Sequence, residues 1–562
     1  MPDFKTWKLR GCIAALAWCL TVHAIASAQN DMPALSDGSN PSAVPPTTDT
    51  VIENPSPAIP ELSDRTEDEV TRFLAMAPAG DNDGIQPGLR IIMSNRLAAG
   101  ESLAVLIGCC ACLGLLLPGY LLFYSGLLAR SIDSELIGRC AVYFALLGLA
   151  WVLVIYSLAF ARNAHTYDVA QRELQVMDRD GAPGNLFIGD LSHAGFNDLQ
   201  SNWSSERLFF PLRRATDAIP HIYFLAFQMT VLLQAVAPLL LMVNRGRSQL
   251  RTSVWLLLWS TLIYAPLCFW VQGGGWLADC LDTAGATATQ LGIGFTALGL
   301  MLAIRSKDTP LVESIGWTDQ AKTGSEKNEN EKTNRAVKDR EAKIALDSSR
   351  LDRGIGMLIV GSLLLAASRS IAFSKTADPY FLNVFLAGAT GLLMWMGLQY
   401  RCRNQSWSGW QMGCLSGIVS MTAAGSHIAP ISALLVGLVS SLASFVCIQI
   451  CAPAALQGVS ATHSNGSSGT ASVLCIIFSL QGVAAMVGLL MVGVLATPDV
   501  AGADSAGRPI VGTIAGNFDQ LRVQLVATAV MALTSMVGGW VLIRLIDGIG
   551  SLFDSRTVRA PS

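Results

Sequence analysis

The sequence has 562 residues, of which 51% are hydrophobic and only 14% are charged. Soluble globular proteins carry about 25% charged residues, so the composition indicates an integral membrane protein. The net charge of −3 is too small to indicate nucleic acid or another polyanion as a partner. The 13 cysteines lie mostly in apolar segments and predict neither a disulfide framework nor a metal site.

Residues 1–28 have the pattern of a secretory signal peptide. Basic Lys5, Lys8 and Arg10 precede an apolar run, and the small residues Ala26, Ser27 and Ala28 offer a cleavage site. A first membrane anchor is the alternative, although the run is short for a span of about 20 residues. The Pro-, Ser-, Asp- and Asn-rich tract 29–98 cannot bury a core, so we expect it to be disordered and extracytoplasmic.

The region 99–552 alternates long apolar runs with polar loops and predicts an all-α polytopic membrane domain. Each run is long enough, or nearly so, to cross a bilayer as a helix, and none contains a histidine. The run at 412–424 is the weakest, and residues 553–562 follow the last run as a short tail. The eleven predicted spans are 102–127, 140–160, 222–243, 254–271, 284–304, 355–373, 381–400, 412–424, 428–451, 471–496 and 521–546.

Loop charges predict how the domain is oriented in a cell (inner) membrane. Basic residues concentrate in the loops on one side, whereas the short opposite loops hold only Lys375, which places the N-terminus outside and the C-terminus in the cytoplasm. Loop 161–221 is then external and insertion 305–353 cytoplasmic. The charge run of the insertion predicts a solvated segment, in part helical, and favours a plain disordered insertion over a regulatory one. The basic residues are Arg130, Arg139, Arg245, Arg247, Arg251, Arg401, Arg403 and several within 305–353.

Five segments carry a family resemblance: LLLPGYLLFYSGLLARS (115–131), FLAFQMTVLLQAVAP (224–238), LDTAGATATQLGIG (281–294), MTAAGSHIAPISALLVGLVSS (421–441) and QGVAAMVGLLMVGVLA (481–496). In this order they resemble spans of the ammonium transporter family (Amt/Mep/Rh), and with weaker matches the similarity covers 102–552. The resemblance implies two inverted five-helix halves plus a final helix. It also implies a homotrimer with one pore in each subunit.

The resemblance assigns the family's twin pore histidines to Gln290 and Gln481, and thus implies a divergent member that lacks both. An imidazole titrates near neutrality and can relay a proton, whereas an amide can only donate and accept hydrogen bonds. A simpler role for either glutamine is an interhelical hydrogen bond.

The resemblance also implies residues near the outer mouth. Phe227 matches one gate phenylalanine, and the other falls on Val231. The cation-recruiting aromatic falls on Gln272, with Trp270 close by, and the recruiting serine falls near Ser368 or Arg369. A lost cation–π contact would cost roughly 0.5–2 kcal/mol. The family's structural acidic residue is kept as Asp282.

Three function classes follow from these residues. The whole-chain resemblance favours an ammonium or ammonia transporter, and the pore substitutions imply altered or reduced conduction. The alternative is a non-transporting sensor or assembly partner on the same scaffold. An enzyme is not expected, because the spans hold no nucleophile–base constellation. Besides the lipid bilayer and the solute, the sequence indicates no cofactor and identifies no cytoplasmic regulator.

Overall fold

Helices form wherever the sequence has a long apolar run, because backbone polar groups in a membrane must bond within the segment. The computed structural model describes residues 100–128, 132–161, 164–168, 173–177, 186–196, 221–305, 329–373, 378–402, 409–451, 467–502 and 509–557. All belong to the unit Ile92–Ser562. The predicted signal peptide 1–28 and tract 29–98 lie outside the described residues and stay predictions.

Ten helices in the described part are long and apolar enough to cross a membrane. They confirm ten of the predicted spans with small shifts at the ends, and the fold is almost entirely helical. The spanning helices are Gly100–Leu127, Ser134–Phe160, Ile222–Val243, Gln249–Val271, Thr287–Ile304, Ser349–Ala372, Tyr380–Arg401, Pro430–Cys451, Thr470–Leu495 and Phe518–Gly550.

Several spans change from α- to π-helical geometry along their length. The elements within the first five spans are η2 (Cys112–Leu116), α4 (Leu117–Leu127), α5 (Ser134–Ala150), η3 (Trp151–Ile155), α6 (Tyr156–Phe160), α7 (His221–Val243), α8 (Gln249–Trp259), η6 (Ser260–Tyr264), α9 (Ala265–Val271), η7 (Thr287–Leu291) and α10 (Gly292–Arg305). Later elements are α11 (Glu329–Phe373), α12 (Tyr380–Arg401), α13 (Trp410–Ala424), α14 (Pro430–Cys451), α15 (Ser467–Ile477), η11 (Phe478–Val483), α16 (Ala484–Leu495), α17 (Pro498–Ala501) and α18 (Phe518–Thr557).

The weakest predicted span, 412–424, is the short helix α13. It has 15 residues, a length of about 22 Å, against about 30 Å for a hydrocarbon core. Almost every residue of α13 is buried, and it packs against α12, α14 and α16. Neighbouring helices therefore replace lipid around this short element.

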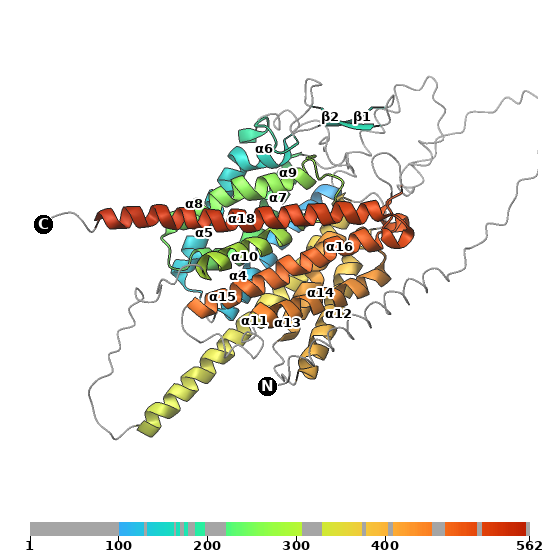
Figure 1. Ribbon diagram of the computed structural model, residues 1–562. Coiled ribbons are helices and arrows are strands. Elements are labelled where there is room, and N and C mark those ends of the chain that lie inside the picture. The colour runs from blue at the N-terminus through green and yellow to red at the C-terminus, as the bar shows by residue number, and fades with distance from the viewer. Residues whose placement is uncertain are drawn as a thin grey trace, which may run out of the picture. The chain divides into compact units, whose positions relative to one another are not determined.

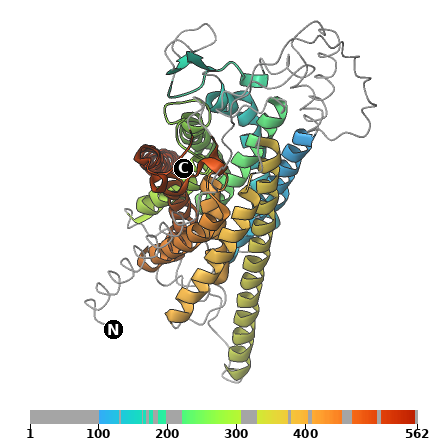
Figure 2. The same ribbon diagram turned by 90° about the vertical axis from the view of Figure 1, so that its right-hand side faces the viewer.

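Helix extends into the charged insertion and into the C-terminal tail. The insertion 305–353 was expected to be solvated and in part helical, and from Glu329 onward it is helix: α11 begins there and continues into the membrane. Strong helix formers such as Glu, Lys, Arg and Ala dominate this stretch, and α11 projects past its neighbours in Figures 1 and 2. The predicted tail 553–562 likewise begins as helix, because α18 continues to Thr557.

The described part of loop 161–221 contains one exception to the all-helical fold. Strands β1 (Ala164–Asp168) and β2 (Glu173–Met177) pair antiparallel, with Ala164 opposite Met177. The short helix η4 (Ala194–Phe196) follows. Near it, the backbone N–H of His193 donates to the Ser157 hydroxyl at 3.0 Å, which fixes this stretch on α6.

Helix α18 links the two ends of the bundle and lies along α10 and α16 (Figure 1). Near its start, Gln520 Nε2 donates to the Asp279 carbonyl at 3.5 Å. Near its other end, Asp547 accepts two hydrogen bonds from the Arg247 guanidinium at 2.8 and 2.9 Å. The residues 520 and 547 lie about 40 Å apart along a helix of 1.5 Å rise. We call the end of the bundle near Gln520 and Asp279 the Asp282 end, and the end near Asp547 the Arg247 end.

Candidate functional site

Gln290 and Gln481 both lie in π-helical turns within the bundle. Gln290 belongs to η7 and Gln481 to η11, at corresponding places in the two halves of the chain. A π-helical turn inserts one residue into an α-helix, and such turns occur often at functional sites. The equivalent spans therefore share both a glutamine and its unusual backbone geometry.

The two glutamine-bearing spans meet in a direct backbone contact between α10 and η11. A Cβ built on Gly294 would lie 2.1 Å from the backbone nitrogen of Gly482. Only glycine allows this approach at position 294, and the contact draws the two glutamine-bearing spans together at the centre of the fold.

The Gln481 side chain is completely buried. Its Nε2 donates to the Tyr124 hydroxyl at 3.3 Å, and its Oε1 has no hydrogen-bond partner among the described residues. The Tyr120 hydroxyl lies near the side chains of both Gln481 and Gln290, and the rings of Tyr120 and Tyr124 stack with centroids 6.3 Å apart. Two amides and two hydroxyls thus form one small polar cluster.

Tyr120 and Tyr124 were not predicted from the sequence as site residues. Both belong to α4 and stand four residues apart, so they share one face of the helix. Both hydroxyls stand on a largely apolar run, LLLPGYLLFYSG. Their four-residue spacing is the feature of the sequence that could have identified them as site residues.

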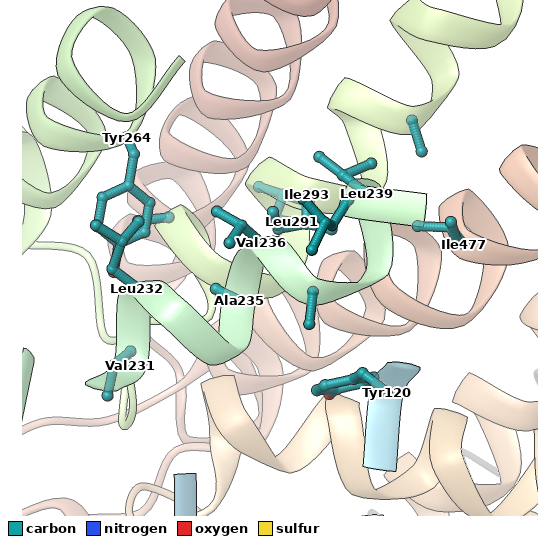
Figure 3. Packing of buried hydrophobic residues seen from close by; sticks show 14 of the residues in the cluster. Tyr120, Val231, Leu232, Ala235, Val236, Leu239, Tyr264, Leu291, Ile293 and Ile477 are labelled. Atoms are coloured by element: carbon teal, nitrogen blue, oxygen red, sulfur yellow. The ribbon is translucent and has the colours of Figure 1, made fainter. Parts of the chain in front are cut away.

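Apolar side chains surround this polar cluster. Leu291 and Ile477, beside the glutamine-bearing turns, are fully buried. Figure 3 shows Leu291 and Ile293 among the side chains of α7, with Tyr120 on a neighbouring helix. The amide oxygen of Gln481 therefore lies in a setting where an unmade hydrogen bond costs about 1–3 kcal/mol.

The predicted gate residues lie on α7, toward the Asp282 end. The Phe227 side chain is fully buried, and Val231, one turn further on, is 5% exposed. A Cβ on Gly108 would lie 2.7 Å from Cε2 of Phe227. The ring is therefore packed tightly against the first span.

Asp282 holds the start of the fifth span. Its carboxylate accepts hydrogen bonds from the backbone N–H groups of Ala286 and Thr287, both at 2.8 Å, and from the Thr287 hydroxyl at 2.6 Å. Burial raises the pKa of the Asp282 carboxyl, whereas the Thr287 and Ala286 hydrogen bonds and the charge of Arg369 act to lower it. All three bonds serve the helix start, so the geometry is that of a cap.

Ser368 and Arg369 stand side by side on α11 but have different partners. The Ser368 hydroxyl donates to the Ala104 carbonyl at 2.7 Å. The Arg369 guanidinium lies 5.6 Å from the centroid of the Phe227 ring, and its Nη2 donates to the Thr283 carbonyl at 2.9 Å. Arg369 thus points into the bundle and contacts a predicted gate residue.

Gln272 and Trp270 lie close in sequence but reach different places. The Gln272 amide nitrogen lies against Gly285, 2.7 Å from where a Cβ would be, so it lies beside the Asp282 cap. The Trp270 indole N–H donates to the Phe187 carbonyl at 2.7 Å, and its ring packs on Trp276. Trp270 is therefore tied to the 186–196 stretch and does not join Gln272.

Among the described residues, no group of three or more His, Cys, Asp or Glu side chains is placed to hold a metal ion. His427 lies at the Asp282 end, where its Nδ1 and the Thr283 hydroxyl are 3.0 Å apart. This histidine is outside the described spanning helices.

Comparisons with known proteins agree with this architecture. Candida albicans Mep2 superposes with a TM-score of 0.58 at 21% identity, covering 81% of this chain and 85% of that one. A structure named Sensor Amt Protein reaches a TM-score of 0.55 at 18% identity, covering 81% and 95%. These structures establish the fold.

Sequence relatives are also similar along most of the chain. The ammonium transporter of Aquifex aeolicus is 23% identical over 464 residues, which cover 81% of this chain and 89% of the relative. Ammonium transporter 3 of Schizosaccharomyces pombe is 26% identical over 464 residues, covering 77% and 80%. These relatives are transporters rather than enzymes. A model of the Ammonium Transporter Family matches residues 104–314 and 353–556, most of the membrane domain. The chain therefore belongs to the Ammonium Transporter Family.

Proposed function

We propose that this chain lets neutral ammonia cross the membrane and carries no net current of ammonium ions. One observation supports the proposal above all others: the Oε1 of Gln481 has no hydrogen-bond partner in the described part of the chain and is buried between Tyr124 and an apolar shell. An unpaired buried acceptor stabilises whatever small donor reaches it, because the protein has already met the cost of desolvating it. Ammonia carries three N–H donors and one lone pair, which suit this amide oxygen and a tyrosine hydroxyl.

The same residues explain why charge would not follow. Passage of ammonia with a separate proton requires a group that gains and loses a proton near neutral pH. An amide does not titrate there, and a tyrosine hydroxyl has an ordinary pKa of about 10. The positions that hold imidazoles in the family carry Gln290 and Gln481 here. The proton of ammonium would therefore not cross the membrane with the ammonia.

The membrane setting belongs to the same proposal. We place the Asp282 end outside, because the loops at the Arg247 end carry most of the short-loop arginines. The N-terminus is then outside, the C-terminus is cytoplasmic, and the membrane is the cell (inner) membrane. Following the family resemblance, three copies assemble with one pathway in each.

Purified protein in liposomes tests the function directly. After an ammonium chloride jump, a dye inside should report faster alkalinisation than in protein-free liposomes, because ammonia enters and takes up a proton there. A planar bilayer with the same protein should show no current under an inward ammonium gradient. The sample should have the mass of three chains in mild detergent.

Two results would contradict the proposal. A robust, saturable ammonium current would show charge moving without imidazoles. Alkalinisation no faster than in protein-free liposomes would remove transport and favour a sensor or an assembly partner. Co-purification with a histidine-bearing family member would then support a partner role.

Orientation is tested with a thiol reagent that does not cross membranes. A cysteine at Ser325, in the charged insertion, should stay unlabelled in intact cells and become labelled after lysis. A cysteine at Ala515, an exposed residue of η12 (Thr513–Ala515) at the Asp282 end, should be labelled in both. The unmodified chain corrects for its native cysteines. The reverse pattern would invert the proposed topology.

A further inference from the structure

The Arg369 guanidinium occupies the face of Phe227 that looks toward the Asp282 end. The cation lies 5.6 Å from the ring centroid, within the range of a cation–π contact. A second contact, Nη2 to the Thr283 carbonyl at 2.9 Å, directs the side chain toward the loop that leads to Gln290. An arginine near a helix end usually extends to the lipid surface, but this one turns inward.

The backbone that carries Arg369 is fixed close to this ring. The preceding residue, Ser368, donates to the Ala104 carbonyl of the first span at 2.7 Å. A Cβ on Gly108 would lie 2.4 Å from the Ser368 hydroxyl and 2.7 Å from the Phe227 ring. The first span, α7 and α11 thus meet without spare room beside the residue that precedes Arg369.

Two carboxylates share the electrostatic surroundings of this cation. Asp282 and Asp378 both lie within electrostatic range of the guanidinium. Asp282 caps the fifth span, and Asp378 accepts from the Tyr380 N–H at 2.9 Å and the Ser426 hydroxyl at 2.7 Å. Without Arg369, this region would keep two carboxylates beside the Phe227 ring, which together would attract a small cation.

We infer that Arg369 is a specificity-determining residue, a tethered cation that fills the cation position over Phe227 and keeps ammonium from binding there. This inference rests on the proposed function, in which solute arrives at the Asp282 end. A fixed positive charge repels a second cation at close range in a partly buried site, whereas neutral ammonia meets no such repulsion. Arg369 would thus exclude cations before any solute reaches Gln481.

Charge displacement on a solid-supported membrane tests this inference. Arg369→Gln keeps a donor for the Thr283 carbonyl but removes the charge, and Arg369→Lys keeps the charge. After an ammonium jump, Arg369→Gln should give a transient displacement at least tenfold larger than that of the unmodified protein or Arg369→Lys. No steady current should follow, because the glutamines remain.

The outcomes separate this inference from the proposed function. If folded Arg369→Gln gives no larger transient than the unmodified protein, or if Arg369→Lys behaves like Arg369→Gln, the inference is wrong and the proposed function is untouched. If the unmodified protein already carries steady current, the proposed function fails first. Melting temperature and size-exclusion profile show whether each variant is folded, and Arg369→Met is a second uncharged variant should Arg369→Gln misfold.

Discussion

Replacing Gly294 with alanine is expected to destabilise the membrane domain by about 1–3 kcal/mol or more, the usual range for overpacking a tight core. The added Cβ would lie 2.1 Å from the nitrogen and 2.2 Å from the Cα of Gly482, and both are backbone atoms. Neither atom can rotate away, so the spans of Gln290 and Gln481 must separate. The apparent melting temperature in detergent should fall clearly.

Two matched variants make this measurement specific. Gly482→Ala places its Cβ 3.1 Å from the Gly294 Cα, a contact that needs only a small shift, so its effect should be much smaller. Gly397→Ala, on α12, meets nothing within 4 Å and should be neutral or slightly stabilising. Equal melting temperatures for Gly294→Ala and Gly397→Ala would show that the two spans do not meet as described.

Span lengths could be predicted from the sequence because hydrophobic length is a local property. All eleven apolar runs are helical in the structure, including the weak run at 412–424, which forms α13. The start of α11 at Glu329 could not be predicted, because a charged run is compatible with both solvated coil and helix. Helix propensity in that stretch was the better guide.

Contacts at the site could be predicted only in part. Corresponding motifs in the two halves placed Gln290 and Gln481 at equivalent positions, and the structure brings their spans together. What these glutamines do remains a proposal. Trp270 shows the limit of sequence proximity: it stands two residues from Gln272, yet it binds the Phe187 carbonyl, a partner 83 residues away in sequence.

The π-helical turns and the Tyr124 hydrogen bond could also not be predicted from the sequence. Both depend on which helices pack together, and no local pattern of residues specifies an inserted residue in an otherwise regular helix. The inward direction of Arg369 has the same origin. Its partners come from distant parts of the chain: Phe227 from the third span and Thr283 from the loop before the fifth.

Replacing Gln481 with leucine is expected to lower protein-mediated ammonia permeability by about tenfold. The amide oxygen is the unpaired acceptor on the proposed path, and one hydrogen bond contributes about 0.5–1.5 kcal/mol, which at the upper end is a factor of about ten. Leucine fills a similar volume without offering an acceptor. Liposome alkalinisation after an ammonium jump, corrected for protein-free liposomes, measures the change.

The effect on stability should be small and serves to separate transport from folding. Leucine removes a buried oxygen that has no partner but also the donor to the Tyr124 hydroxyl, so gain and loss nearly cancel. Gln399→Leu, a buried amide on α12 away from the tyrosines, should leave permeability unchanged. A Gln481→Leu protein that melts normally and passes ammonia as fast as the unmodified chain would mean that solute does not meet this amide. The proposed path past the two glutamines would then be wrong, because it requires the solute to bind the Gln481 amide oxygen.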